Sequence, residues 1–214
     1  MITFYYGSGS APAWRVWLAL EYKQLAYEFK LMSFSAGELK TPAFRALNPR
    51  GKVPLLIDDG FALWESNAIV EYLEEQYPAT LRLFPGATRQ RSIVRRWVSE
   101  IDDNFGAALS KLTGWVMWTP KEKWKEERIV EARQAVIDEL EYLGTHMGGN
   151  FIAGNAITAA DFALYPQVAT LARCDLRKPA LGMVAACPPA IAAWAKRIEA
   201  LPFFDKTIPP HWKE

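Results

Sequence analysis

Two serines near the N-terminus stand where a hydroxyl could take part in chemistry. Ser8 and Ser10 lie in the segment GSGSAPAWRV, between the apolar run ITFYY and the helix-like run WRVWLALEYK. A serine hydroxyl can donate a hydrogen bond to an anion and so favour its ionised form. The same hydroxyl is well suited to cap the helix that follows. The local sequence leaves both roles open for Ser10.

The cysteines do not indicate metal or disulfide chemistry. Only Cys174 and Cys187 occur, and neither belongs to a CxxC motif or to a Cys/His spacing suited to zinc. We expect both thiols to pack as small hydrophobic side chains, and we predict no metal site.

The N-terminal third of the sequence alternates strand and helix signals. ITFYY and AYEFKLM favour strands, because aromatic or β-branched residues recur in them with a two-residue period. VPLLIDDGFALW predicts a hairpin, since Asp-Gly suits a turn with positive φ. Ser66 is then a candidate N-cap for a helix over SNAIVEYLEEQYP. Residues 1–78 are therefore predicted to form a small α/β domain with a mixed sheet.

The remainder of the chain shows helical spacing and no convincing strand. The segment PATLRLFPGATR contains two prolines and a glycine, and predicts a linker over residues 79–87. Beyond it, apolar residues recur at i, i+3 and i+4, which predicts an all-helical domain over residues 88–214. Thr158 and Asp161 resemble a capping box, so Asp161 is expected to stabilise the fold rather than touch substrate.

The balance of charged residues indicates which kinds of molecule this protein binds. The 214-residue chain is 50% hydrophobic and carries 25 Lys and Arg against 24 Asp and Glu, a balance that favours neither nucleic acid nor an anionic membrane. Its longest apolar stretches are broken by Asp161 and Pro166, and the N-terminus lacks the basic and apolar regions of a signal peptide. We expect a cytoplasmic protein whose partner is a small molecule or another protein.

Three segments together resemble the cytosolic glutathione transferases. They are GSGSAPAWRVWLAL, NPRGKVPLLIDDGFALWESNAIVEYL and FIAGNAITAADFALYP, in the order and spacing of that family. The resemblance implies a thioredoxin-like N-terminal domain, an all-helical C-terminal domain, and a homodimer active in detoxification. It also implies glutathione as co-substrate, with no cofactor. GSGSAPAWRV, LMSF and IPPHW look most like the rho class, and GSAP is also similar to the delta class.

The resemblance gives the Ser10 hydroxyl a catalytic role. Thioredoxin-like redox proteins carry CxxC where this chain reads Ser10-Ala11-Pro12-Ala13, so both sulfurs needed for thiol–disulfide exchange are missing. Ser10 would instead stabilise the thiolate of glutathione. Tyr6 is the main rival, because several transferase classes use a tyrosine at the end of the first strand, although packing on the strand is the commoner role.

The resemblance also implies a glutathione site. A cis-proline at Pro54 would expose the backbone of Val53 to the cysteinyl main chain of glutathione. Glu65 and Ser66 would hold the γ-glutamyl end, since an acid can pair with its ammonium group and a helix start can bind its carboxylate. Two basic residues, Lys52 and Lys40, could pair with the glycyl carboxylate, with a solvated surface charge as the alternative for Lys40.

The second substrate is expected to be a small apolar electrophile, bound between the domains. The candidate lining residues are Tyr6, Phe105, Leu109, Trp115 and Trp118, although apolar residues at helical spacing more often belong to a core. His211 and Trp212, near the C-terminus, could close this cleft or simply pack.

Two further functions stay open beside a glutathione S-transferase. A zeta-like isomerase or a dehalogenase would use glutathione on other substrates, but the Ser-Ser-Cys run of the zeta class is replaced here by Ser-Ala-Pro. A non-catalytic module for hydrophobic ligands or assembly could use the same fold. The joint presence of Ser10, Val53, Glu65 and Ser66 argues against such a module.

Overall fold

The computed structural model describes residues 1–213, which form two compact units. The first unit contains Met1–Leu83 together with the residues from Leu201 onward, and the second runs from Phe84 to Ala200. Each unit has its own architecture, mixed α/β in the first and helical in the second.

The first unit is built on a four-stranded mixed sheet in the order β2-β1-β3-β4. The central strand β1 (Ile2–Gly7) pairs in parallel with β2 (Tyr27–Met32) and antiparallel with β3 (Leu55–Asp58). β3 continues into β4 (Phe61–Trp64) through a tight turn, in which Asp59 and Gly60 have φ values of 47° and 89°. The hairpin predicted from Asp-Gly is therefore confirmed.

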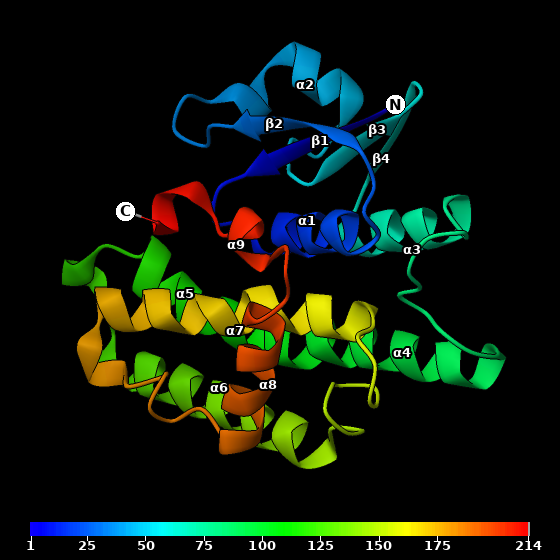
Figure 1. Ribbon diagram of the computed structural model, residues 1–214. Helices are drawn as coiled ribbons and strands as arrows, with labels where there is room; N and C mark the ends of the chain where they lie inside the picture. The colour runs from blue at the N-terminus through cyan, green and yellow to red at the C-terminus, as the bar shows by residue number, and fades with distance from the viewer. Residues whose placement is uncertain (214) are drawn as a thin grey trace. The chain divides into compact units, whose positions relative to one another are not determined.

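Helices cover both faces of this sheet. Figure 1 shows α1 and α3 on one face and α2, preceded by the short helix η1, on the other. Side chains of β1 alternate between the faces: the Tyr6 ring lies 5.0 Å from Trp17 of α1, and the Tyr5 ring lies 5.9 Å from Phe44 of α2. The bounds are α1 Ala11–Tyr22, η1 Glu38–Lys40, α2 Pro42–Leu47 and α3 Ser66–Gln76.

The C-terminal segment packs on α1 of the first unit. It contains the short helices α9 (Phe204–Thr207) and η6 (Pro210–Trp212). Trp14 Nε1 donates to Thr207 Oγ1 at 3.1 Å, and the Trp14 ring meets the Trp212 ring edge-on at 5.2 Å. This placement differs from the helical domain predicted over residues 88–214, because Trp14 offers these residues both an apolar surface and a hydrogen-bond donor.

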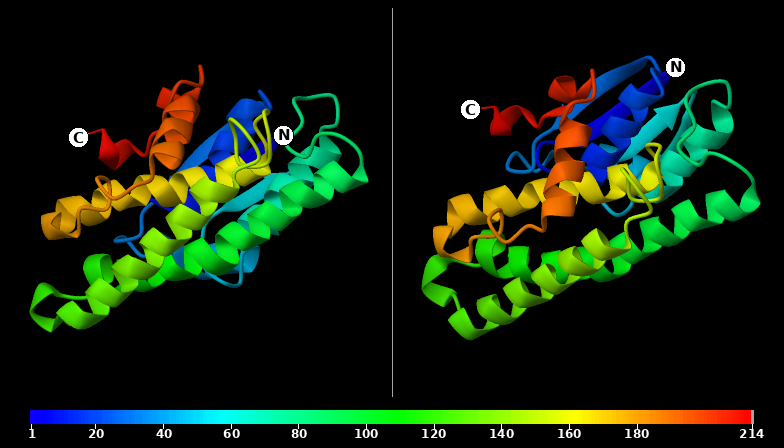
Figure 2. Two further views of the ribbon diagram at one scale, coloured as in Figure 1. Left: turned by 90° about the horizontal axis from the view of Figure 1, so that it is seen from below. Right: turned by 60° about the horizontal axis from the view of Figure 1, so that its bottom comes forward.

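The second unit contains only helices and turns, apart from an isolated bridge between Phe151 and Gly154. Figure 2 shows α6 and α7 running beside the rod formed by α4 and α5, with α8 crossing them. No helix within residues 1–213 is both long and apolar enough to cross a membrane. The bounds are α4 Thr88–Glu100, η2 Ile101–Phe105, α5 Gly106–Thr113, η3 Gly114–Trp118, η4 Lys121–Lys123, α6 Glu126–His146, α7 Ala159–Arg177, η5 Pro179–Leu181 and α8 Pro189–Glu199.

A buried carboxylate anchors the start of α7. Asp161 is fully buried and accepts hydrogen bonds from the backbone and hydroxyl of Thr158, at 2.8 and 3.0 Å. It also accepts from the backbone of Ile152 at 3.0 Å and from Trp194 Nε1 at 2.8 Å. Burial raises the pKa of the Asp161 carboxyl, and these donors oppose that rise. The predicted capping box is confirmed, and its acid also ties α7 to α8.

Candidate functional site

Ser10 lies at the N-terminal end of α1 and closes a tight turn. Its backbone N–H donates to the Gly7 carbonyl at 3.0 Å, and Gly9 has a φ of 85°, which glycine adopts without strain. The half-buried Ser10 hydroxyl accepts from the backbone N–H of Ala13 at 3.3 Å and so caps the helix. A hydroxyl that accepts one hydrogen bond still has its own hydrogen to donate. The capping role of Ser10 therefore leaves a donor role available.

Tyr6 points into the core of the first unit. Its side chain is fully buried, and its ring lies 5.0 Å from Trp17 and 5.5 Å from Phe29. The phenol oxygen accepts from the backbone N–H of Gly9 at 3.3 Å, and burial raises the pKa of Tyr6 to about 12. Tyr6 thus supports the turn from inside the fold, and a ligand outside the fold has no exposed surface of it to contact.

The loop before β3 contains a cis peptide bond between Val53 and Pro54, as predicted for Pro54. Asn48 Nδ2 holds this loop by donating to the Lys52 carbonyl at 2.7 Å. Gly51 has a φ of 60°, and a Cβ atom there would lie 2.8 Å from the carbonyl of Leu39. The loop therefore needs glycine at this position, and Val53 follows, two residues before β3 begins.

Glu65 and Ser66 begin α3. Glu65 occupies the N-cap position with a φ of 69°, an uncommon conformation for a residue other than glycine. Ser66 is therefore the first residue of the helix and not its N-cap, which corrects the prediction by one position. Ser66 belongs to the first turn of α3, whose backbone N–H groups have no acceptor within the helix.

Arg15 supports this helix end from α1 and was not singled out in the sequence. Its side chain is buried, and its Nη1 donates to Ser66 Oγ at 3.3 Å and to Asn67 Oδ1. Because a guanidinium can only donate, the Ser66 hydroxyl keeps its own hydrogen for another acceptor. The sequence signal that could have indicated a role for Arg15 is that it is the one charged residue inside the apolar run WRVWLAL.

The predicted lysines lie on the surface of the first unit. Lys52 immediately precedes Val53, and Lys40 is the last residue of η1; both side chains are exposed. Lys52 is therefore adjacent in the chain to the cis bond, whereas Lys40 belongs to a separate turn.

The predicted apolar residues of the second unit differ sharply in exposure. Phe105 and Leu109 are buried, so they present little surface to a substrate. Trp115 is half-buried, and Trp118 is 82% exposed. Phe105 ends η2, and both tryptophans lie in η3; each of these elements is a π-helical turn within the rod from α4 to η3. Such turns often occur at functional sites in helical proteins.

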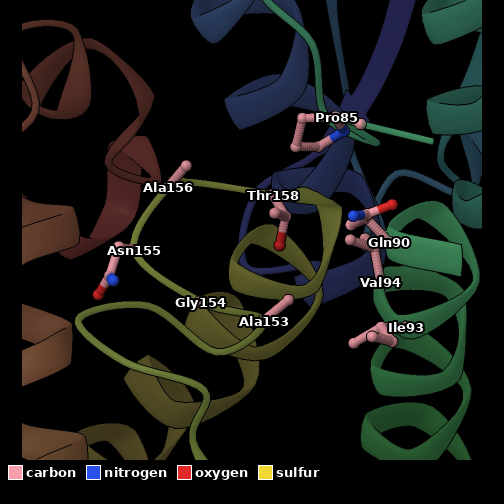
Figure 3. A pocket seen from close by; sticks show the side chains of 10 residues that line it. Pro85, Gln90, Ile93, Val94, Ala153, Gly154, Asn155, Ala156 and Thr158 are labelled. Carbon is pink, nitrogen blue, oxygen red and sulfur yellow. The ribbon is translucent and has the colours of Figure 1, made fainter.

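A separate pocket of about 240 Å³ opens in the second unit. Gln90, Ile93 and Val94 project from α4 and face the loop of residues 153–158 across it (Figure 3). Its lining contains no titratable side chain and none of the predicted site residues. Among residues 1–213, no three His, Cys, Asp or Glu side chains are grouped closely enough to hold a metal ion.

Comparison with known proteins identifies the family. The model of the glutathione S-transferase N-terminal domain matches residues 9–76, which include the Ser10 turn, the cis bond and α3. The model of the glutathione S-transferase C-terminal domain matches residues 117–197. The chain belongs to the glutathione S-transferase family.

Individual members of the glutathione S-transferase family match over nearly the whole chain. It is 30% identical to glutathione S-transferase A of Pleuronectes platessa, over all of this chain and 93% of that protein. It is 34% identical to a probable maleylacetoacetate isomerase of Vibrio cholerae serotype O1, over 94% of this chain and 92% of that protein. A glutathione S-transferase from the Antarctic clam Laternula elliptica is 32% identical, with a TM-score of 0.84, and the match covers 100% of this chain and 94% of the clam protein.

Proposed function

We propose that this chain is a serine-type glutathione S-transferase in which the Ser10 hydroxyl stabilises the thiolate of bound glutathione. The observation that carries the proposal is the contrast between two hydroxyls beside one turn. Ser10 is half-buried at a helix N-terminus with its hydrogen available, whereas the Tyr6 phenol is enclosed by the core. The Ser10 hydroxyl is thus better placed than the Tyr6 phenol to donate a hydrogen bond to a sulfur at the N-terminal end of α1.

A hydrogen bond from Ser10 and the N-terminus of α1 can together supply the free energy needed to stabilise a thiolate. A free thiol has a pKa of about 8.5, and lowering it by about two units requires about 2.7 kcal/mol. A hydrogen bond to a charged group contributes about 1.5–3 kcal/mol, and a helix N-terminus adds about 0.3–1 kcal/mol. The Ser10 hydroxyl and the start of α1 together can therefore supply the required stabilisation.

The remaining residues of the first unit would hold the tripeptide. The backbone of Val53, next to the cis bond, would pair with the cysteinyl residue of glutathione. Glu65 would bind its γ-glutamyl ammonium group, and the Ser66 hydroxyl, oriented by Arg15, would donate to the carboxylate at that end. Lys52 and Lys40 would face the glycyl carboxylate as point charges.

Catalysis would then join sulfur to carbon. The thiolate attacks an electrophilic carbon, the new carbon–sulfur bond forms, and the leaving group departs with its electron pair. We propose small apolar electrophiles, since Trp115 and Trp118 keep apolar surface in η3. A cytoplasmic homodimer of the rho class, active in detoxification, remains our proposal for the biological setting.

Titration of the bound thiol tests the mechanism. The ultraviolet absorbance of the thiolate is followed against pH with glutathione bound to the unchanged protein and to Ser10→Ala. We expect the pKa of the bound thiol to rise by about one to two units in Ser10→Ala, as the loss of one hydrogen bond to a charged group predicts. An unchanged pKa together with an unchanged conjugation rate would refute the role of Ser10. Failure of glutathione to bind would favour the non-catalytic module.

An isomerase is the second candidate, and the 34% identity to the Vibrio cholerae protein favours it. In that reaction glutathione would add to a conjugated double bond, the resulting single bond would rotate, and glutathione would leave again. Ala11 follows Ser10 here, where the zeta run has a second serine. Parallel assays with a halogenated aromatic electrophile and with a cis-enedioate separate conjugation from isomerisation. Conjugation consumes glutathione, whereas isomerisation releases it again.

A further inference from the structure

A histidine from the C-terminal segment lies on the turn that presents Ser10. His211 Nδ1 lies 2.5 Å from Ser8 Oγ, at hydrogen-bonding distance. The imidazole also lies beside Gly9, where an added Cβ atom would lie 2.9 Å from His211 Cε1. The two residues that precede Ser10 thus both lie beside one side chain that is about 200 positions away in the sequence.

The neighbouring tryptophan selects the tautomer of this histidine. Trp212 Nε1 donates to His211 Nε2 at 2.9 Å. An indole N–H can only donate, so Nε2 must be the acceptor and the imidazole carries its hydrogen on Nδ1. His211 therefore donates to Ser8 Oγ, and the Ser8 hydroxyl keeps its own hydrogen.

The segment that carries His211 is anchored to the helix that carries Ser10. Trp14 binds Thr207 through its indole N–H and contacts the Trp212 ring, and its backbone N–H donates to the Ser10 carbonyl at 2.9 Å. About two helical turns further along α1, Glu21 forms an ion pair with Lys206 at 2.7 Å. The imidazole is thereby fixed relative to the start of α1.

We propose that His211 is a positioning residue for Ser10. The turn contains Gly7 and Gly9, whose backbones can adopt many conformations, so its single observed conformation depends on the contacts around it. His211 binds Ser8 and restricts the space beside Gly9, and these contacts direct the Ser10 hydroxyl toward the glutathione sulfur. The inference rests on the proposed function of Ser10, and His211 acts through the turn without touching the sulfur.

Three variants and one control test this role. His211→Ala and Ser8→Ala remove opposite ends of one hydrogen bond, and His211→Asn restores an N–H donor. The control is His146→Ala, since His146 is the other histidine of the chain and lies exposed in α6 of the second unit. For His211→Ala and Ser8→Ala we expect a higher pKa of the bound thiol and a kcat/KM lower by about threefold to tenfold, the effect of one neutral hydrogen bond. His211→Asn should recover part of the change in thiol pKa and part of the loss in kcat/KM. His146→Ala should change neither the thiol pKa nor kcat/KM.

A double-mutant cycle with Ser10→Ala separates positioning from direct contact. If His211 acts through Ser10, His211→Ala adds no further rise in thiol pKa once Ser10 is alanine. Additive rises would overturn the inference, because they would mean that His211 acts on the sulfur independently. A raised thiol pKa in Ser10→Ala with an unchanged one in His211→Ala and Ser8→Ala would also overturn it while leaving the proposed function intact. An unchanged thiol pKa together with an unchanged conjugation rate in Ser10→Ala would refute the proposed role of Ser10, and with it the inference about His211.

Discussion

Arg15 Nη1 lies 3.3 Å from Ser66 Oγ and so joins the middle of α1 to the first residue of α3. These two helices also carry, at their N-termini, the groups proposed to meet the sulfur and the γ-glutamyl end of glutathione. A buried charge thus links the helices that carry the two ends of the proposed glutathione site.

Replacing Arg15 by lysine should weaken glutathione binding. Lysine keeps the charge, but its side chain is shorter and ends in a compact ammonium group, so it loses the position from which Arg15 Nη1 donates to both Ser66 and Asn67. We expect the Kd for glutathione to rise about tenfold, and the free energy of unfolding to fall by about 1–3 kcal/mol. Calorimetric titration and denaturant unfolding measure the two effects. Arg128→Lys, on the exposed face of α6, is the matched control, and equal affinities in both variants would contradict the role of Arg15.

Glu65→Gly should separate stability from binding. The φ of 69° at Glu65 is unfavourable for a side chain and open to glycine, so the strain of about 1–3 kcal/mol is relieved. The greater freedom of glycine in the unfolded chain offsets about 0.5–1 kcal/mol of that gain. We expect a higher Tm with a glutathione Kd at least about tenfold larger, from the lost ion pair. Glu65→Ala should weaken binding without raising Tm; a rise there would rule out backbone strain as the cause.

Tyr6→Phe should leave the chemistry almost intact. The phenol of Tyr6 has a pKa of about 12, so it is protonated at neutral pH, and it faces the core. We expect the thiol pKa to stay close to its original value and the free energy of unfolding to fall by about 1 kcal/mol, from the lost bond to Gly9. Thiolate titration and thermal unfolding provide the readouts. A thiol pKa raised as far as in Ser10→Ala would transfer the proposed role to Tyr6.

Asp161→Asn should destabilise the second unit. The carboxylate accepts four hydrogen bonds, whereas an asparagine amide offers one oxygen and turns its own donors toward the remaining N–H and O–H groups. We expect a loss of about 2–4 kcal/mol in the free energy of unfolding. Denaturant unfolding of Asp161→Asn against Asp103→Asn, an exposed acid of η2, measures it. A loss equal to that of the control would show that the buried hydrogen bonds are dispensable.

Local signals predicted much of the fold. The Asp59-Gly60 turn, the alternation in β1 and the capping box at Thr158 each depend on residues within a few positions of one another. Such features follow from backbone preference and side-chain periodicity, which a sequence displays directly. The cis bond at Pro54 came from family resemblance, because proline alone seldom indicates it.

Long-range pairs account for what the sequence did not reveal. Arg15 and Ser66 are 51 positions apart, and Ser8 and His211 are 203 positions apart. No periodicity links residues at these separations, so their contacts depend on how whole elements pack. The positive φ of Glu65 was equally hidden, since glutamate has no preference for that conformation.

The anchoring of the C-terminal segment on Trp14 has a consequence for protein synthesis. Trp14 and Thr207 are 193 positions apart, and the N-terminal part of a nascent chain leaves the ribosome first. The strands and helices around Ser10 can therefore form early, but the turn acquires His211 only about 200 residues later in synthesis. Full conjugating activity would then require a chain that extends through His211, and a chain cut before that residue would fold around Ser10 but work more slowly.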